Sequence, residues 1–231
     1  MRIDAVLVNA LIRGIFRLLC RMDVAAMKAI PRTGPALLVM NHISFLEAPL
    51  IATFAASPSL AALSKKENLS SPLYWYFARI WNAIPIDRGG VDTESFKRCL
   101  EWIDKGGVLG LAPEGTRSRD GILQRGKAGV AMLAQKAGVP VWPVAHWGAE
   151  DFASMLKRFK RPSIHVRVGA PYMIEPVGSM TKTVRQEVAD DIMASIAALM
   201  PVAYRGPYRD SAELPTRHLK PCSRSGAAIT S

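Results

Sequence analysis

The sequence predicts an α/β fold with a mostly parallel central sheet flanked by helices, preceded by an N-terminal amphipathic helix. Strand-like apolar runs alternate with helix-like segments through the middle of the chain, which is the pattern of βα units. Apolar residues make up 49% of the 231 residues, ample for a packed core. Polar loops follow several of the strand-like runs, and open α/β sheets bind ligands at the carboxyl ends of their strands.

Residues 1–24 are expected to form the amphipathic helix. Asn9, Arg13, Arg17 and Arg21 recur every four residues and therefore share one stripe, while the rest of the window is almost wholly apolar. A wide apolar face with an arginine stripe is typical of a helix lying in a membrane interface. The alternative is a helix packed on the domain with its arginines in solvent. Those arginines argue against a signal peptide, and no segment reaches the roughly 20 apolar residues that span a bilayer.

Residues 25–200 are predicted to form one α/β domain. Strands are expected at Leu37–Met40, Ser59–Leu63, Ala83–Ile86, Val108–Leu111, Val139–Ala145 and Ile164–Val168. Helices are expected at Leu46–Ala55, Pro72–Ile80, Thr93–Asp104, Lys127–Lys136 and Val184–Leu199. Two prolines within residues 139–145 suggest an edge strand or an irregular one, which either lines an apolar channel or belongs to the core.

Residues 201–231 are expected to be a weakly ordered or loosely docked tail, because they hold prolines, serines and arginines without an apolar period. The net charge of +11 indicates an anionic partner. No basic run interleaved with aromatics supports a nucleic acid in that place. The cysteines, Cys20, Cys99 and Cys222, are far apart and lack metal-ligand spacing, which favours a reducing, cytosolic compartment.

The segment Asn41 to Glu47 carries the strongest chemical signal. His42 directly follows the apolar strand-like run, and Glu47 follows five positions later. A histidine oriented by a carboxylate is the minimum equipment for removing a proton from a hydroxyl. Ser44 and Glu47 also match a capping box, so the alternative is that Glu47 caps the next helix. His42 and Glu47 are the predicted catalytic pair.

A second polar segment, Glu114-Gly115-Thr116-Arg117-Ser118, follows the predicted strand at Val108–Leu111. Its guanidinium, hydroxyls and backbone N–H groups suit a phosphate, although a structural Glu114–Arg117 pair is the plainer alternative. Arg88 also ends a strand, and Lys127 opens a helix whose N-terminus attracts anions. Each of these two, taken alone, is more often a solvated charge.

The other histidines lack comparable neighbours, but His146 also follows a predicted strand and is the reserve candidate for the base. No Gly-x-Ser-x-Gly elbow and no Gly-rich Walker loop occurs. Without a nucleophile motif, direct transfer to an acceptor is favoured over a covalent enzyme intermediate.

Taken in order, four blocks resemble the motifs of the glycerolipid acyltransferase family, the lysophosphatidic acid acyltransferases and their relatives. The blocks are Asn41-His42-x4-Glu47, Ile84-Pro85-Ile86-Asp87-Arg88, Glu114-Gly115-Thr116-Arg117-Ser118 and Val139-Pro140-Val141-Trp142-Pro143-Val144. The resemblance covers roughly residues 25–200. One departure matters, because the first motif of the family normally ends in aspartate and Glu47 stands there in this chain.

The resemblance implies transfer of a fatty acyl group from acyl-CoA or acyl carrier protein to a lysophospholipid hydroxyl, foremost that of 1-acyl-sn-glycerol 3-phosphate, giving phosphatidic acid. His42 would be the base and Glu47 its orienting acid. The acceptor phosphate would be held by a set of residues in the later blocks: Arg88, Glu114, Gly115, Thr116, Arg117 and Lys127. No metal or cofactor is required, because a thiolate leaves readily.

The expected partners are a membrane surface, the lysophospholipid and the thioester donor, with no nucleic acid, at the cytoplasmic face of a membrane as a peripheral or monotopic protein. Three alternatives stay open. They are a different acceptor (glycerol 3-phosphate or another lyso-lipid), a catalytically silent lipid-binding protein, and a basic nucleic-acid-binding module.

Overall fold

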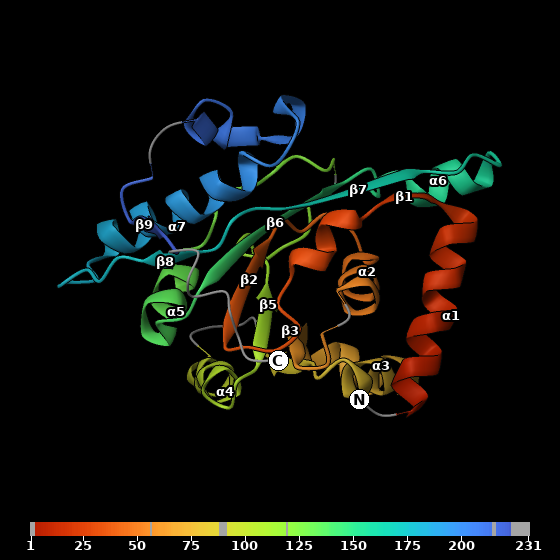
Figure 1. Ribbon diagram of the computed structural model, residues 1–231, viewed down its shortest axis with the longest axis horizontal. Helices are drawn as coiled ribbons and strands as arrows, with labels where there is room; N and C mark the ends of the chain where they lie inside the picture. The colour runs from red at the N-terminus through yellow and green to blue at the C-terminus, as the bar shows by residue number, and fades with distance from the viewer. Residues whose placement is uncertain (1–2, 56, 88–91, 119, 214–215, 223–231) are drawn as a thin grey trace.

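The molecule is built around a central β-sheet whose strands differ in length, as the computed structural model in Figure 1 shows. The structure describes residues 3–55, 57–87, 92–118, 120–213 and 216–222. Within them the strand order is β1-β7-β6-β2-β5-β3-β4, with β8 paired to β6 and β9 to β8. The strands are β1 (Arg21–Asp23), β2 (Ala36–Met40), β3 (Leu60–Lys65), β4 (Ile84–Ile86), β5 (Val108–Leu111), β6 (Val141–Trp147), β7 (Ser163–Val168), β8 (Tyr172–Ile174) and β9 (Leu219–Pro221).

The centre of the sheet is parallel, which confirms the predicted fold class. Strand β2 pairs in parallel with β5 and β6, and β3 pairs in parallel with β5 and β4. Antiparallel pairing occurs where β7 and β8 meet β6 and where β9 meets β8. Because parallel strands need crossover connections, helices lie on both faces of the sheet.

The helices form two layers around the sheet (Figure 1), with α4, α5 and α7 over one face and α1 and α2 over the other. The α-helices are α1 (Ile3–Leu19), α2 (Glu47–Phe54), α3 (Pro72–Ile80), α4 (Thr93–Asp104), α5 (Gly129–Ala137), α6 (Phe152–Lys157) and α7 (Lys182–Ala197). Short 3-10 helices occur at Ala25–Ala29, Lys66–Ser70, Val202–Tyr204, Gly206–Tyr208 and Ser211–Glu213.

Strand β2 divides the core between these two layers. Leu37 and Val39 belong to the cluster under α4, α5 and α7, whereas Leu38 and Met40 belong to the cluster under α1 and α2. Successive strand residues point to opposite faces, so a strand buried on both sides must be apolar throughout. The uninterrupted apolar run of β2 thus places its carboxyl end, and His42 after it, in the middle of the sheet.

Helix α1 packs on the domain in an orientation that the arginine stripe did not predict. Its buried residues are Ala5, Asn9 and Phe16, and Asn9 Oδ1 accepts a hydrogen bond from Trp81 Nε1 at 3.0 Å. The large apolar residues of α1 that point outward are Ile3, Val6, Leu7, Leu11, Ile15 and Leu18. Among the described residues, none of the helices is both long and apolar enough to cross a bilayer.

The proline-containing strand β6 is irregular but not at an edge. It is flanked by β2 on one side and by β7 and β8 on the other, so the edge alternative is wrong. Pro143 falls where β7 has ended and β8 has not yet begun, and its carbonyl oxygen accepts from Gly169 N at 2.9 Å. The missing proline N–H therefore faces a break in the pairing and costs no ladder bond.

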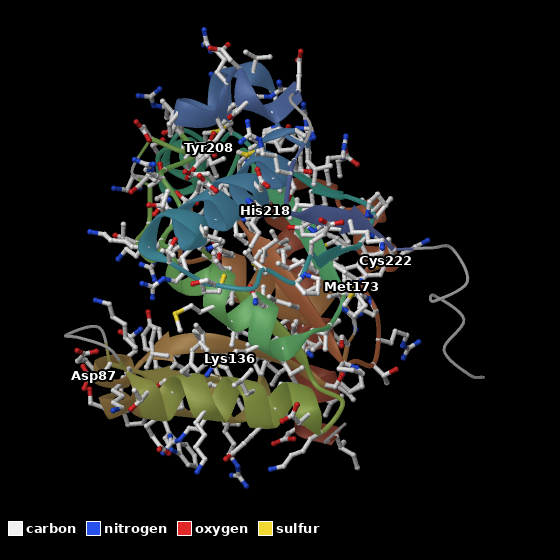
Figure 2. All side chains as sticks on the ribbon, turned by 90° about the vertical axis from the view of Figure 1, so that its left-hand side faces the viewer. Asp87, Lys136, Met173, Tyr208, His218 and Cys222 are labelled. Atoms are coloured by element: carbon white, nitrogen blue, oxygen red, sulfur yellow. The ribbon has the colours of Figure 1, made fainter. Side chains whose placement is uncertain are left out.

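The described part of the C-terminal segment, residues 201–213 and 216–222, is docked on the domain, so of the two expectations, a weakly ordered or a loosely docked tail, the first is wrong for these residues. Tyr208 is buried, and its hydroxyl donates to Asp190 Oδ1 at 2.8 Å. Strand β9 extends the sheet beyond β8. Figure 2 shows this side of the molecule, with Tyr208 and His218 over α7. The segment was misjudged because its contacts are scattered aromatic and polar ones that follow no period.

Candidate active site

His42 and Glu47 meet at the carboxyl end of β2. The Nδ1 atom of His42 lies 2.9 Å from Glu47 Oε2. An ionised carboxylate only accepts, so Nδ1 carries the hydrogen and Nε2 keeps a lone pair. The imidazole is 17% exposed, which leaves its far edge accessible to a ligand. The arrangement therefore presents one basic nitrogen held in a fixed direction.

The capping alternative for Glu47 is wrong. Helix α2 begins at Glu47 itself, Leu46 precedes it as the cap residue, and no side-chain cap is formed. The hydroxyl of Ser44 instead accepts from Leu46 N at 3.2 Å. Among the described residues, the partners of the Glu47 carboxylate are the imidazoles of His42 and His146 and not a backbone N–H of the helix.

A second histidine approaches the same carboxylate from β6. His146 Nε2 lies 3.3 Å from Glu47 Oε2 and 2.9 Å from the carbonyl oxygen of Asn41. The amide of Asn41 in turn grips the His146 backbone, donating to its carbonyl at 2.8 Å and accepting from its N–H at 2.9 Å. This exchange continues the β2–β6 pairing by one side chain beyond the last backbone pair, Met40 with Val144.

The charges of this cluster support one another. Burial alone would raise the pKa of Glu47, but the hydrogen bonds from His146 and His42 outweigh it and the pKa is lowered. Burial alone would lower the pKa of His146, but Glu47 outweighs it and the pKa is raised. Glu47 is therefore ionised at neutral pH despite being buried, as an acid that orients a base must be.

Glu114 does not lie where it could contact a phosphate, the contact that the sequence led us to expect. It is only 2% exposed, and its two oxygens accept from the backbone N–H groups of His42 at 2.7 Å and Gln124 at 2.9 Å. Burial raises the pKa of this carboxyl to about 7, although the backbone N–H donors oppose the shift. We assign Glu114 to holding the loops around His42, because a buried carboxylate repels an anionic ligand.

The rest of the segment, from Gly115 to Arg117, is tied to His42 at both ends. Beyond the bond to Glu114, the N–H of Ser118 donates to the His42 carbonyl at 2.7 Å. Thr116 and Arg117 lie between these two attachments, and both are exposed. The loop thus presents a hydroxyl and a guanidinium beside the histidine.

Lys127 lies across the turn of this loop. Gly115 has a φ of +67°, which favours glycine, and a Cβ added there would come within 3.1 Å of Lys127 Cδ, Cε and Nζ, so the end of the lysine side chain would have to shift. Helix α5 starts at Gly129, so Lys127 precedes the helix instead of opening it. The loop and the lysine come together as predicted, whereas Arg88 lies outside the described residues.

Sequence reasoning missed the roles of Asn41 and His146. Asn41 was visible as part of the first motif, but its backbone-like pairing with β6 depends on a register that the sequence does not reveal. His146 was visible as a histidine after a strand. It is 1% exposed, so it cannot reach a ligand, and its candidacy as the base is wrong.

A histidine–carboxylate pair at the carboxyl end of a parallel strand, with an exposed arginine, threonine and lysine on the neighbouring segments, characterises this α/β protein. The model of the Acyltransferase family matches residues 21–147, more than half of the chain. The chain belongs to that family.

Two relatives illustrate the likeness. A chloroplastic 1-acyl-sn-glycerol-3-phosphate acyltransferase of Brassica napus is 32% identical over 133 residues, 55% of this chain and 38% of that protein. A lyso-ornithine lipid O-acyltransferase of Pseudomonas aeruginosa is 30% identical over 163 residues, 63% of this chain and 60% of that protein. The chain therefore spans less than two thirds of the length of either relative.

The fold has a counterpart among solved structures. The crystal structure of PlsC from Thermotoga maritima, a 1-acyl-sn-glycerophosphate acyltransferase, superposes with a TM-score of 0.61 at 23% identity. The match covers 80% of this chain and 74% of that chain. At this identity the likeness establishes the shared α/β architecture.

Proposed function

We propose that this protein transfers a fatty acyl group from the thioester of acyl-CoA or acyl carrier protein to the free hydroxyl of 1-acyl-sn-glycerol 3-phosphate, forming phosphatidic acid. The observation that carries the proposal is the 2.9 Å contact between His42 Nδ1 and Glu47 in a chain of the Acyltransferase family. The sequence relatives whose names state this activity add support.

The reaction needs only groups that this cluster and its substrates supply. His42 Nε2 takes the proton of the acceptor hydroxyl while the oxygen attacks the thioester carbonyl carbon. Glu47, ionised and bonded to Nδ1, stabilises the imidazolium that forms. Collapse of the tetrahedral intermediate breaks the carbon–sulfur bond, and the thiolate takes the proton back from His42. No cofactor takes part in these steps.

The acceptor phosphate is assigned to the loop beside His42. Arg117 offers two parallel N–H donors, Thr116 a hydroxyl, and Lys127 a point charge folded over Gly115. Because Glu114 and Ser118 tether this loop to the His42 backbone, a phosphate bound there fixes the hydroxyl within reach of Nε2. A contribution from Arg88 stays a prediction.

The outward face of α1 is assigned to a membrane surface. The most exposed apolar residues there are Ile3 at 80%, Leu7 and Leu11 at 65% and Leu18 at 73%, and α3 also exposes Leu73, Tyr74 and Trp75. The two helices are linked through the Asn9–Trp81 hydrogen bond and lie at the same end of the molecule (Figure 1). An apolar surface of this kind suits insertion at the cytoplasmic face of a membrane, where the acceptor lies.

The test is a thioester-consumption assay with purified protein, detergent-dispersed 1-acyl-sn-glycerol 3-phosphate, and acyl-CoA or acyl carrier protein as donor. We expect thiol release that depends on the acceptor, together with phosphatidic acid as product. No turnover with either donor contradicts the activity. If the unphosphorylated 1-acylglycerol is used equally well, the phosphate assignment fails while the activity stands.

A lyso-ornithine lipid is the second candidate acceptor, because the Pseudomonas relative is named for that substrate. Such an acceptor carries a hydroxyl but no phosphate. Including it in the same assay separates the two, since a strong preference for the lyso-aminolipid would assign Arg117 and Lys127 to a carboxylate instead.

A further inference from the structure

The deeply buried His146 has one feature that the proposed reaction does not use. Its Nε2 atom is within 3.3 Å of the same Glu47 oxygen that holds His42. Its Nδ1 atom is buried and has no hydrogen-bond partner in the described part of the chain. A buried polar atom without a partner costs about 1–3 kcal/mol, so a residue that served only to fill space here would be better as an apolar one.

The hydrogen on His146 has a fixed position. Nε2 lies 2.9 Å from the carbonyl oxygen of Asn41, which can only accept, so Nε2 carries the hydrogen. The same hydrogen faces Glu47 Oε2. Asn41 also holds the His146 backbone by two hydrogen bonds, and Asn41 directly precedes His42. The ring of His146 is thus aligned by the residue next to the base.

Resting on the proposed function, we propose that His146 is a positioning residue that acts through Glu47, fixing the direction in which that carboxylate holds His42. The glutamate fits this role better than a shorter acid. Its Oε2 atom comes within reach of both imidazoles at once, on α2 between the end of β2 and the end of β6. An aspartate at position 47 would carry its oxygens one methylene further back.

The proposal is tested by kinetics of His146→Phe and His146→Gln, with His165→Phe as the matched control on the neighbouring strand β7. Phenylalanine keeps the ring and removes the donor, whereas the glutamine amide nitrogen can take the place of Nε2. We expect His146→Phe to lower kcat about 10-fold with both KM values within about twofold of the parent, because positioning acts on the transition state. The kcat of His146→Gln should lie within about threefold of the parent value. The kcat of His165→Phe should equal that of the parent.

Coupling to Glu47 is read from the double variant. If His146 acts through the glutamate, His146→Phe should slow a Glu47→Asp protein by less than about threefold. Equal losses in both backgrounds, or a His146→Phe protein with the parent kcat, would overturn the proposal. So would a folded His146→Gln protein as slow as His146→Phe, because the ring and not the donor would then matter.

A readout that needs no turnover keeps this inference separate from the proposed function. In protein labelled with ¹⁵N at histidine, we expect His146 Nε2 to be protonated at neutral pH, with a resonance that moves in Glu47→Gln while that of His165 does not. An unprotonated Nε2, or one that ignores Glu47→Gln, would overturn the inference even if His146→Phe failed to fold. Absence of acyl transfer by the parent would contradict only the proposed function.

Discussion

Helices α1 and α7 have nearly the same length, 17 and 16 residues, and cover opposite faces of the same sheet. They differ in how much of their apolar surface is buried. Helix α7 buries Val188, Ala189, Ile192, Met193, Ala194, Ile196 and Ala197. Helix α1 buries only Ala5, Asn9 and Phe16 and exposes Leu7, Leu11 and Leu18. One face of the molecule is thus covered by a helix with a buried apolar side, and the other, which carries His42 and Glu47, by a helix whose apolar side is exposed; we propose that this second face meets the substrates.

The largest effect that tests this contrast is on catalysis. We expect His42→Ala to lower kcat about 10³-fold, because it removes the proposed general base. The free energy of unfolding should fall by about 1–3 kcal/mol, because the buried Glu47 carboxylate loses one of its two histidine partners. Acyl transfer and urea unfolding are to be measured on the same preparation, with His165→Ala as the control. Near-normal turnover by His42→Ala would contradict the assignment of the reaction to this face of the molecule.

On the opposite face, Ile192→Ala should act on stability alone. Ile192 is 0% exposed, so truncation should lower the free energy of unfolding by about 3 kcal/mol through lost burial and a residual cavity. Leu11→Ala on α1, where the side chain is 65% exposed, is the matched variant and should stay within about 0.5 kcal/mol of the parent. Equal losses in urea unfolding would mean that both helices are structural.

The site face should also respond to pH. The pKa of Glu114 is raised to about 7 by burial, so the folded protein binds this proton more tightly than the unfolded chain does. Its contribution to stability is then greatest below about pH 4.5 and is lost as the pH rises to 7, by at most about 3 kcal/mol. Urea unfolding between pH 4.5 and 7 should show a flatter profile in Glu114→Gln. An unchanged slope would assign the pH dependence to other groups.

The smallest expected effect concerns attachment to lipid. Replacing Leu7 and Leu11 by serine should weaken binding to phosphatidylcholine–phosphatidylglycerol vesicles about 10-fold, because both side chains would otherwise be buried in the interface. Val202→Ser, an exposed apolar change in the C-terminal segment, is the control. Vesicle co-sedimentation measures both. If the two proteins bind alike, α1 is not the lipid-facing surface.

The sequence was most informative where one period or one motif determines the outcome. The apolar runs predicted the central strands, and the helix expected at Thr93–Asp104 is α4 with the same bounds. The contact between His42 and Glu47 followed from a strand, a loop and a helix that are adjacent in sequence. Such features need no knowledge of how distant segments pack.

The features that were missed depend on long-range packing. Asn41 and His146 are 105 positions apart, and only the β2–β6 register brings them together. The orientation of α1, with its apolar residues exposed, depends on the hydrogen bond between Asn9 and Trp81, which are 72 positions apart. Glu114 was assigned to a ligand because its burial, and its two backbone donors, come from tertiary structure that no local pattern encodes.

The docking of Tyr208 links the end of the chain to the loop that carries the lysine. Its hydroxyl accepts a hydrogen bond at 3.1 Å from the N–H of Gly126, the residue before Lys127. The carbonyl oxygen of Tyr204 accepts from the N–H of Leu123 at 2.8 Å. The segment after α7 therefore acts as a brace behind residues 123–127. Shortening this protein at residue 200 to obtain a minimal domain would remove that brace and leave the segment before Lys127 without its support, even though every motif residue would still be present.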